Sequence, residues 1–154
     1  MSEHRIKLNW KRTTPDFDYK SYIRDHAVTF KNGQSLIMSA APAYKGSPSK
    51  VDPEEAFVVS LSSCHMLTFL ALAAARKMVV DSYLDDAIGY LEKNADDDLA
   101  ITRVILRPKI TFSGKAPDAA TLHDLHDKAH HGCFIANSVK TQVTVESVEP
   151  VSVA

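Results

Sequence analysis

The stretch that decides the fold is residues 52–77, which read DPEEAFVVSLSSCHMLTFLALAAARK. Its opening is a strong helix start, because Asp52 can cap the helix, Pro53 suits the first turn, and two acids complement the positive end of the helix dipole. Almost every later residue is small or apolar, until Arg76 and Lys77 close the stretch. We therefore expect one long helix that runs to about Lys77.

The apolar character of this helix raises the question of a membrane span, because the stretch is about long enough to cross a bilayer. Polar side chains interrupt it between residues 60 and 68, charged residues bracket it, and no second span follows. We interpret it as a helix buried at the centre of a soluble particle, not as a membrane anchor. Residues 1–10 lack a basic region followed by an apolar run, so they are no secretory signal. We expect a cytoplasmic protein.

The chain has 154 residues, of which 45% are hydrophobic, and this is enough for one sizeable core. We expect a single domain over residues 1–154. Its 18 basic and 19 acidic side chains nearly balance. The net charge gives no strong electrostatic reason for binding nucleic acid or an anionic membrane, so we expect neither as a partner.

The residues before the helix predict a small antiparallel sheet. Alternating or apolar runs at 5–12, 22–30 and 35–40 indicate three strands, and the sequence KNGQ at 31–34 is typical of a tight turn between the last two. Proline, glycine and several serines mark 41–52 as a connecting loop.

The residues after the helix predict a long hairpin and a second helix. The hairpin is expected to pair 81–93 with 100–113, and the helix to begin near Pro117 and to end or bend at Gly132. A final strand is expected at 141–148. The predicted order is three strands, helix, two strands, helix, strand, which is an α+β fold.

Two cysteines carry the candidate chemistry. Taken alone, Cys64 in the middle of the long helix would be a small buried hydrophobe. Cys133, however, follows Gly132 at a junction of helix and turn. In the cytoplasm two cysteines are more often free, catalytic or metal-bound than joined in a structural bridge. A thiolate that attacks a peroxide becomes a sulfenic acid, and a nearby second thiol can condense with it.

The segments around both cysteines resemble the OsmC/Ohr family of organic hydroperoxide reductases. The matching residues are DPEE at 52–55 and the apolar stretch after it, SCH at 63–65, and CFIANSV at 133–139. The resemblance implies an intertwined homodimer of α+β subunits, with two active sites at the interface between the chains. It also implies that Cys64 is the peroxidatic thiol and that Cys133 is the resolving thiol.

The resemblance further implies a glutamate at Glu54 and an arginine that this glutamate orients. The segment before the helix, PAYKG at 42–46, holds no arginine, which leaves Arg24 and Arg12 as candidates. We favour Arg24, because it falls in a predicted strand, whereas Arg12 runs into a loop. A guanidinium stabilises a thiolate, and a carboxylate can hold the guanidinium by a bidentate contact. Glu54 precedes Cys64 by ten residues, about 15 Å along a helix, so we expect it to act at a distance or across the dimer.

These observations predict a thiol-dependent peroxidase that reduces organic hydroperoxides, with no bound cofactor and no metal. Electrons would come from an external thiol or dithiol that reopens the disulfide. An apolar pocket near Cys64 would favour organic over inorganic peroxides. The residues expected to line it are Phe57, Leu61, Leu67 and Phe134.

Two alternatives stay open. The first is a protein of the same fold that binds a small apolar ligand without catalysis. The second is a redox-sensing or metal-binding module, for which the two cysteines and four histidines offer soft ligands. Of these histidines, we expect one to tune a thiol and most to lie on the surface or at helix ends. They are His65, His126, His130 and His131.

Overall fold

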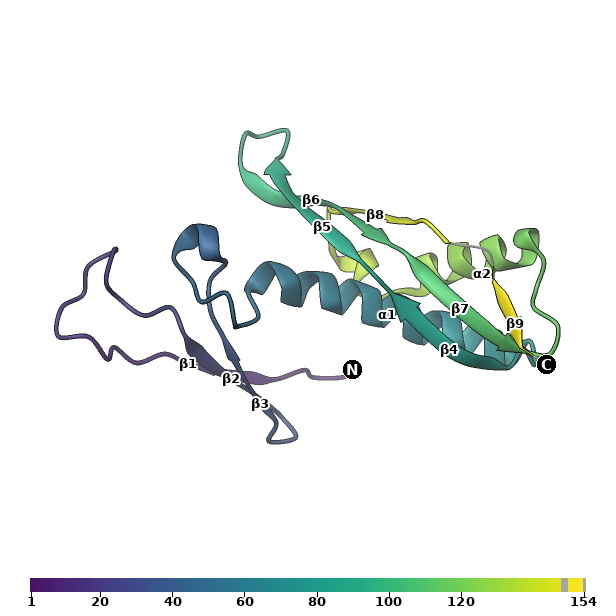
Figure 1. Cartoon of the computed structure of the whole chain (residues 1–154), viewed down its shortest axis with the longest axis horizontal. Coiled ribbons are helices and arrows are strands. Elements are labelled where there is room, and N and C mark those ends of the chain that lie inside the picture. Colours follow the sequence, from purple (N-terminus) through teal and green to yellow (C-terminus); the bar gives the residue numbers. More distant parts are fainter. Residues whose placement is uncertain (148–149, 154) are drawn as a thin grey trace. The chain divides into compact units, whose positions relative to one another are not determined.

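The computed structural model describes residues 1–147 and 150–153, with the backbone alone at Val153. The chain divides into two compact units, Met1–Ala56 and Phe57–Ala154, which we call unit 1 and unit 2 and describe separately (Figure 1). That residues 1–154 form a single domain stays a prediction. The predicted α+β class is confirmed, since the described residues hold two α-helices and three sheets.

Unit 1 contains the predicted antiparallel sheet of three strands. Strand β2 lies between β1 and β3, and Gly33 has the positive φ of 84° that the tight turn before β3 requires. All three strands are shorter than predicted, and a short 3-10 turn lies in the connecting loop. The bounds are β1 (Ile6–Asn9), β2 (His26–Phe30), β3 (Ser35–Met38) and η1 (Pro42–Tyr44).

The long helix α1 (Pro53–Ala75) begins and ends close to the predicted residues. Its start is a reciprocal capping box, in which the Glu55 N–H donates to Asp52 Oδ1 (2.8 Å) and the Asp52 N–H donates to Glu55 Oε2 (3.1 Å). Its end follows from Lys77, whose φ of 58° is incompatible with a continuing right-handed helix.

One face of α1 is buried and the opposite face is not. Burial recurs every four residues, as expected for a single face of a helix. On the other side lies the exposed stripe of α1, in which Val59 and Leu67 keep 62% and 60% of their surface accessible. The buried residues are Leu61, His65, Phe69 and Ala73. The exposed stripe consists of Val59, Ser63, Leu67, Ala71 and Ala74.

By length and composition, α1 could cross a membrane. Its buried face nevertheless packs on protein, because Phe69 and Ala73 belong to a core cluster with residues of another helix and a strand. One face of α1 therefore belongs to a protein core, whereas burial of the whole helix, as the sequence suggested, stays a prediction.

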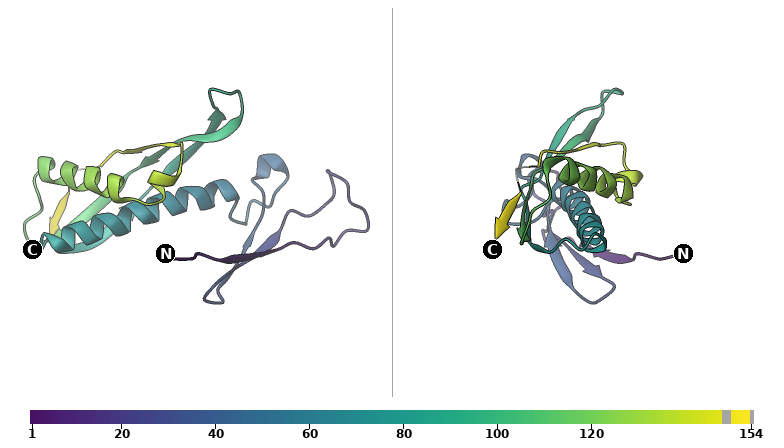
Figure 2. Two further views of the ribbon diagram at one scale, coloured as in Figure 1. Left: turned by 180° about the vertical axis from the view of Figure 1, so that it is seen from behind. Right: turned by 90° about the vertical axis from the view of Figure 1, so that its right-hand side faces the viewer.

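Unit 2 places two helices against two three-stranded sheets, and Figure 2 shows α1 and α2 on the same side of its strands. The central strands are β6 and β7, and each pairs with a strand from the end of the described chain in parallel orientation. One sheet is β4 (Val80–Asp85), β7 (Pro108–Ser113) and β9 (Val151–Val153). The other is β5 (Ile88–Lys93), β6 (Leu99–Leu106) and β8 (Gln142–Val145). The remaining elements are α2 (Ala119–Gly132) and η2 (Ala136–Ser138).

The predicted hairpin is present, but it is broken in the middle, so four strands replace two. At the break the carboxylate of Asp85 accepts the backbone N–H of Arg107 (2.6 Å) and the hydroxyl of Ser62, so this N–H is not used in a strand ladder. The predicted final strand corresponds to β8. Its last predicted residue, Val148, lies outside the described residues, and β9 was not predicted.

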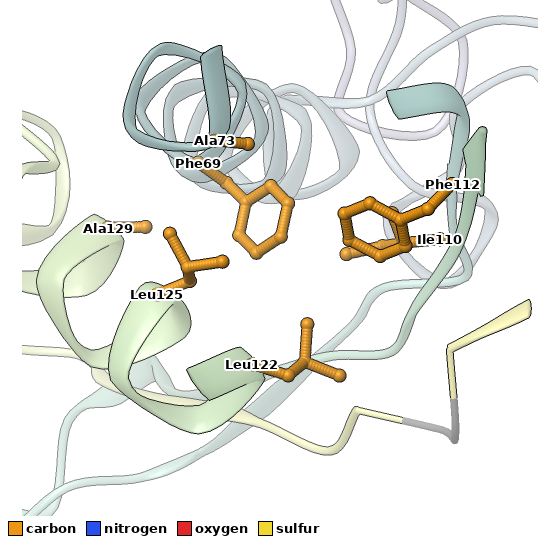
Figure 3. Close-up of a cluster of buried hydrophobic side chains, with 7 residues drawn as sticks. All are labelled: Phe69, Ala73, Ile110, Phe112, Leu122, Leu125 and Ala129. Atoms are coloured by element: carbon orange, nitrogen blue, oxygen red, sulfur yellow. The ribbon is translucent and has the colours of Figure 1, made fainter. Parts of the chain in front are cut away.

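A hydrophobic cluster fixes the two helices on β7 (Figure 3). Phe69 of α1 and Leu125 of α2 are fully buried in it and point toward one another. The cluster holds the two helices in one relative position, and it thereby fixes the relative positions of the side chains on them. Its buried members are Phe69, Ala73, Ile110, Phe112, Leu122, Leu125 and Ala129.

Candidate functional site

The two cysteines lie next to each other inside unit 2. Cys64 is half-buried in the middle of α1, and Cys133, only 1% exposed, caps the end of α2. Both are reduced, and the two side chains lie close enough for Cys64 to raise the pKa of Cys133. The fold thus brings together two thiols that the sequence separates by 69 positions.

The surroundings of Cys133 favour its protonated form. Burial is the largest influence and raises the pKa of the Cys133 thiol, and the neighbouring Cys64 thiol raises it further. The backbone N–H groups of Ala136 and Ile135 act in the opposite direction, and the Ala136 nitrogen lies 3.4 Å from Cys133 Sγ. The net pKa stays above the ordinary value, so Cys133 is mostly a neutral thiol near neutral pH.

A glycine allows the two cysteine-bearing segments to approach. A Cβ atom on Gly132 would lie 3.0 Å from Cγ2 of Thr68, which is tighter than ordinary contact. Thr68 follows Cys64 by one turn, and its hydroxyl donates to the Cys64 carbonyl (2.9 Å). Gly132 in turn immediately precedes Cys133. The contact of Gly132 with Thr68 therefore bears directly on the spacing of the two thiols.

The Gly132→Ala variant is expected to slow formation of the disulfide between Cys64 and Cys133 about three- to tenfold, because the added methyl pushes the helices apart by a few tenths of an ångström. Alanine is the better helix former, so thermal stability should not fall. Stopped-flow oxidation followed by thiol counting measures the rate. Adding Thr68→Ser, which removes Cγ2, should restore it. A Gly132→Ala protein with the wild-type rate would contradict this account of the glycine.

Glu54 lies on the first turn of α1, where Glu55 and not Glu54 completes the capping box. Glu54 is half-buried. Within residues 1–147 and 150–153, its carboxylate makes no hydrogen bond or ion pair. A second carboxylate is thus available at the helix start, and its role in catalysis stays a prediction.

Arg24 is held rigidly, but not in the way the sequence suggested. It lies in the loop before β2, so its predicted place in a strand is wrong. Its guanidinium donates to the carbonyls of Tyr22 and Tyr19 (2.5 Å each) and stacks on the Tyr22 ring, 3.9 Å from the centroid. Arg12, in contrast, is exposed and bonded to the carbonyls of its own loop, as expected. Arg24 and Cys64 belong to different units, and their pairing stays a prediction.

Arg24 also forms part of the wall of a cavity of about 470 Å³ in unit 1. Aromatic side chains dominate this wall, and Trp10, Phe17 and Tyr22 pack on one another with ring centroids 5.2 to 6.2 Å apart. Sequence reasoning missed this cluster, although four aromatic residues within 10–22 were a signal for it. The lining residues are Leu8, Trp10, Phe17, Tyr22, Arg24, His26, Ser39, Ala40 and Pro53.

The residues predicted to line a pocket do not belong to this cavity. Leu61 is 1% exposed and lies in a core cluster, and Phe57 packs against the same cluster. Phe134 and Leu67 are exposed side chains of unit 2.

Two histidines are fully buried, which corrects the expectation of surface or helix-end positions. His65 of α1 and His126 of α2 are 1% and 3% exposed, and Nε2 of the first lies 3.1 Å from Nδ1 of the second. Burial lowers the pKa of each to about 4, so both imidazoles are neutral at neutral pH. His131 is exposed at the end of α2, as expected, and His130 is half-buried. Over the described part of the chain, no three His, Cys, Asp or Glu side chains are grouped as metal ligands.

Comparison with known proteins gives one family and several structures. The family model described as OsmC-like protein matches residues 46–148. An OsmC-like protein of unknown function from Vibrio cholerae O1 biovar eltor strain N16961 is 44% identical in sequence, with a TM-score of 0.91, and the match covers 96% of this chain and 100% of that chain. A search of the curated proteins found no match.

More distant structures share the fold alone. An OsmC-like protein from Mycoplasma pneumoniae is 14% identical, with a TM-score of 0.75 and coverage of 97% of this chain and 98% of that chain. The organic hydroperoxide resistance protein OhrB of Bacillus subtilis is also 14% identical, with a TM-score of 0.65 and coverage of 96% and 98%. The likeness extends over both units described above.

Proposed function

The chain belongs to the OsmC-like protein family, and from this premise we propose that it is a thiol-dependent peroxidase that reduces organic hydroperoxides. The observation that carries the proposal is the adjacency of the Cys64 and Cys133 thiols within one unit. Two reduced cysteines in contact form a disulfide readily when one of them is oxidised.

The reaction has three balanced steps. The Cys64 thiolate attacks the outer oxygen of the hydroperoxide, the O–O bond breaks, and the organic oxygen takes up a proton and leaves as an alcohol. Cys64 is then a sulfenic acid. The Cys133 sulfur attacks the Cys64 sulfur, the S–O bond breaks, and the hydroxyl leaves as water with the Cys133 proton. An external dithiol supplies two electrons and two protons, becomes a disulfide itself, and returns both cysteines to thiols.

The raised pKa of Cys133 supports this division of roles. A thiol that stays protonated at neutral pH is a poor first nucleophile, because the thiolate is the reactive form. In the second step its proximity to the Cys64 sulfur compensates for this low nucleophilicity, and its proton leaves with the water. We therefore assign the resolving role to Cys133 and the peroxidatic role to Cys64.

Arg24 and Glu54 complete the proposed site. Arg24 is fixed by two loop carbonyls and a tyrosine ring, and a fixed guanidinium suits the stabilisation of a thiolate and of peroxide oxygens. We place the protein in the cytoplasm, where thiols stay reduced.

The test of this function is mass spectrometry after one equivalent of an organic hydroperoxide. The wild-type protein is expected to show an intrachain link between Cys64 and Cys133. The Cys133→Ser variant should instead stop at oxidised Cys64, and Cys64→Ser should consume no peroxide. Steady-state peroxide consumption with a dithiol separates an enzyme from a sensor or a binding protein. An unmodified Cys64 in the wild-type protein would rule out the peroxidase.

We also propose a homodimer, in which the exposed stripe of α1 packs against a second copy. Apolar side chains in a continuous exposed stripe are typical of an interaction surface. The Leu67→Glu variant should therefore sediment as a monomer in analytical ultracentrifugation. Leu84→Glu serves as the control, because Leu84 is 67% exposed but belongs to β4 and not to the stripe. A dimeric Leu67→Glu protein would contradict this interface.

A further inference from the structure

Helices α1 and α2 meet along a row of specific contacts within unit 2. Residues at the C-terminal end of α1 contact the early part of α2, and residues nearer the middle of α1 contact its late part, so the two helices run antiparallel. At one end Arg76 forms an ion pair with Asp124 (2.6 Å). The following contacts are Phe69 and His65 with His126, Thr68 with Gly132, and Cys64 with Cys133.

The His65–His126 contact is a directional hydrogen bond between neutral rings. The rings are nearly parallel, at 12°, and their centroids are 5.4 Å apart. With both imidazoles neutral, one proton lies between Nε2 of His65 and Nδ1 of His126, and one ring donates while the other accepts. Only a narrow range of distances and angles satisfies such a bond.

Stability alone does not account for this pair. Each ring has a second nitrogen, and neither His65 Nδ1 nor His126 Nε2 has a hydrogen-bond partner in the described parts of the chain. Buried polar atoms without partners destabilise a fold, so two apolar side chains of similar size would serve a purely structural core as well or better. What the hydrogen bond adds is a defined register between the helices, which apolar contacts specify only loosely.

We propose that the His65–His126 hydrogen bond is a positioning contact, which holds the Cys64 and Cys133 sulfurs at the separation needed for disulfide formation. His65 directly follows Cys64, and His126 precedes Cys133 by seven residues, about two helical turns. Because the helix is rigid, fixing His126 also fixes the C-terminal end of α2, where Cys133 lies. The biological purpose of this contact rests on the proposed function, because the disulfide is the product of the second step.

The measurement is the effective concentration of the two thiols, obtained from the ratio of reduced to disulfide protein in a glutathione redox buffer. In the double variant His65→Leu/His126→Leu, this concentration should fall about five- to tenfold, the factor that one buried hydrogen bond contributes. The free energy of unfolding of the reduced protein should stay the same or rise, because the two unpartnered nitrogens are gone. The effective concentration of the thiols would thus fall without any fall in the free energy of unfolding.

Two further variants separate positioning from general destabilisation. In His65→Gln/His126→Asn, the amide groups fall near the positions of Nε2 and Nδ1, so the hydrogen bond and the wild-type effective concentration should both return. Leu122→Ala, in the same helix and core but remote from the cysteines in sequence, should lower stability and leave the effective concentration unchanged.

The proposal is overturned if the double leucine variant keeps the wild-type effective concentration, or if Leu122→Ala lowers that concentration as much as the leucine pair does. The redox buffer contains no hydroperoxide, so these outcomes do not depend on peroxidase activity. Failure of Cys64 to react with a hydroperoxide would instead refute the proposed function and leave the positioning result intact.

Discussion

Replacing Arg24 with methionine is expected to lower the second-order rate constant for oxidation of Cys64 by an organic hydroperoxide about 10²- to 10³-fold. Methionine keeps the length and apolar stem of the side chain, but it removes the charge that favours the thiolate and the donors that can bind peroxide oxygens. The effect should be large because this guanidinium is already fixed by its loop, and a fixed donor loses little entropy when the reaction proceeds.

The rate constant is measured by stopped-flow oxidation in the Cys133→Ser background, where the first step is isolated. Arg12→Met is the matched control, since Arg12 is the other candidate arginine and donates to carbonyls of its own exposed loop. Its rate should equal that of the parent protein. Equal losses in both variants, or a loss confined to Arg12→Met, would remove Arg24 from the site.

Acidification from pH 6.5 to pH 4 is expected to lower the free energy of unfolding by on the order of 3 kcal/mol for each of the two buried histidines. In the unfolded chain, His65 and His126 take up protons below the ordinary pKa of 6.5, whereas in the folded protein they do so only near pH 4. Between these values the unfolded state binds more protons, so stability falls as the pH falls.

Urea unfolding at pH 6.5 and at pH 4 measures this loss. The His65→Gln/His126→Asn protein has no titrating group at either position, and it should lose less stability than the wild type over the same interval. The histidine share is the difference between the two losses, because carboxylates and the exposed histidines contribute equally to both. Parallel losses in the two proteins would show that the buried pair is not protonated on unfolding.

Features that depend on local sequence were predictable. The start of α1 was correct because Asp52 and Glu55 form the capping box between themselves and Pro53 suits the first turn. The turn before β3 was correct for the same reason, since Gly33 provides the required backbone conformation within a few residues. The positions of both helices, and hence of Cys64 and Cys133 on them, follow from such signals.

Features that depend on distant contacts were not predictable. At the break in the hairpin, Asp85 accepts hydrogen bonds from Arg107 of the opposite strand segment and from Ser62 of α1. The periodicity of the sequence does not predict contacts between residues so far apart. The burial of His65 and His126 likewise appears only when the two helices are placed face to face. The proximity of the two cysteines was expected from their chemistry and from the family resemblance, not from any pattern along the chain.

The parallel pairing of β8 with β6 and of β9 with β7 has a consequence for synthesis on the ribosome. The sheet of β6 lacks its third strand until residues 142–145 have left the exit tunnel, and the sheet of β7 lacks its third strand until residues 151–153 have left it. Until then β6 and β7 each present one unpaired edge, and open edges of this kind invite association between nascent chains. Truncation within residues 142–153 should therefore reveal itself first as insoluble product in expression.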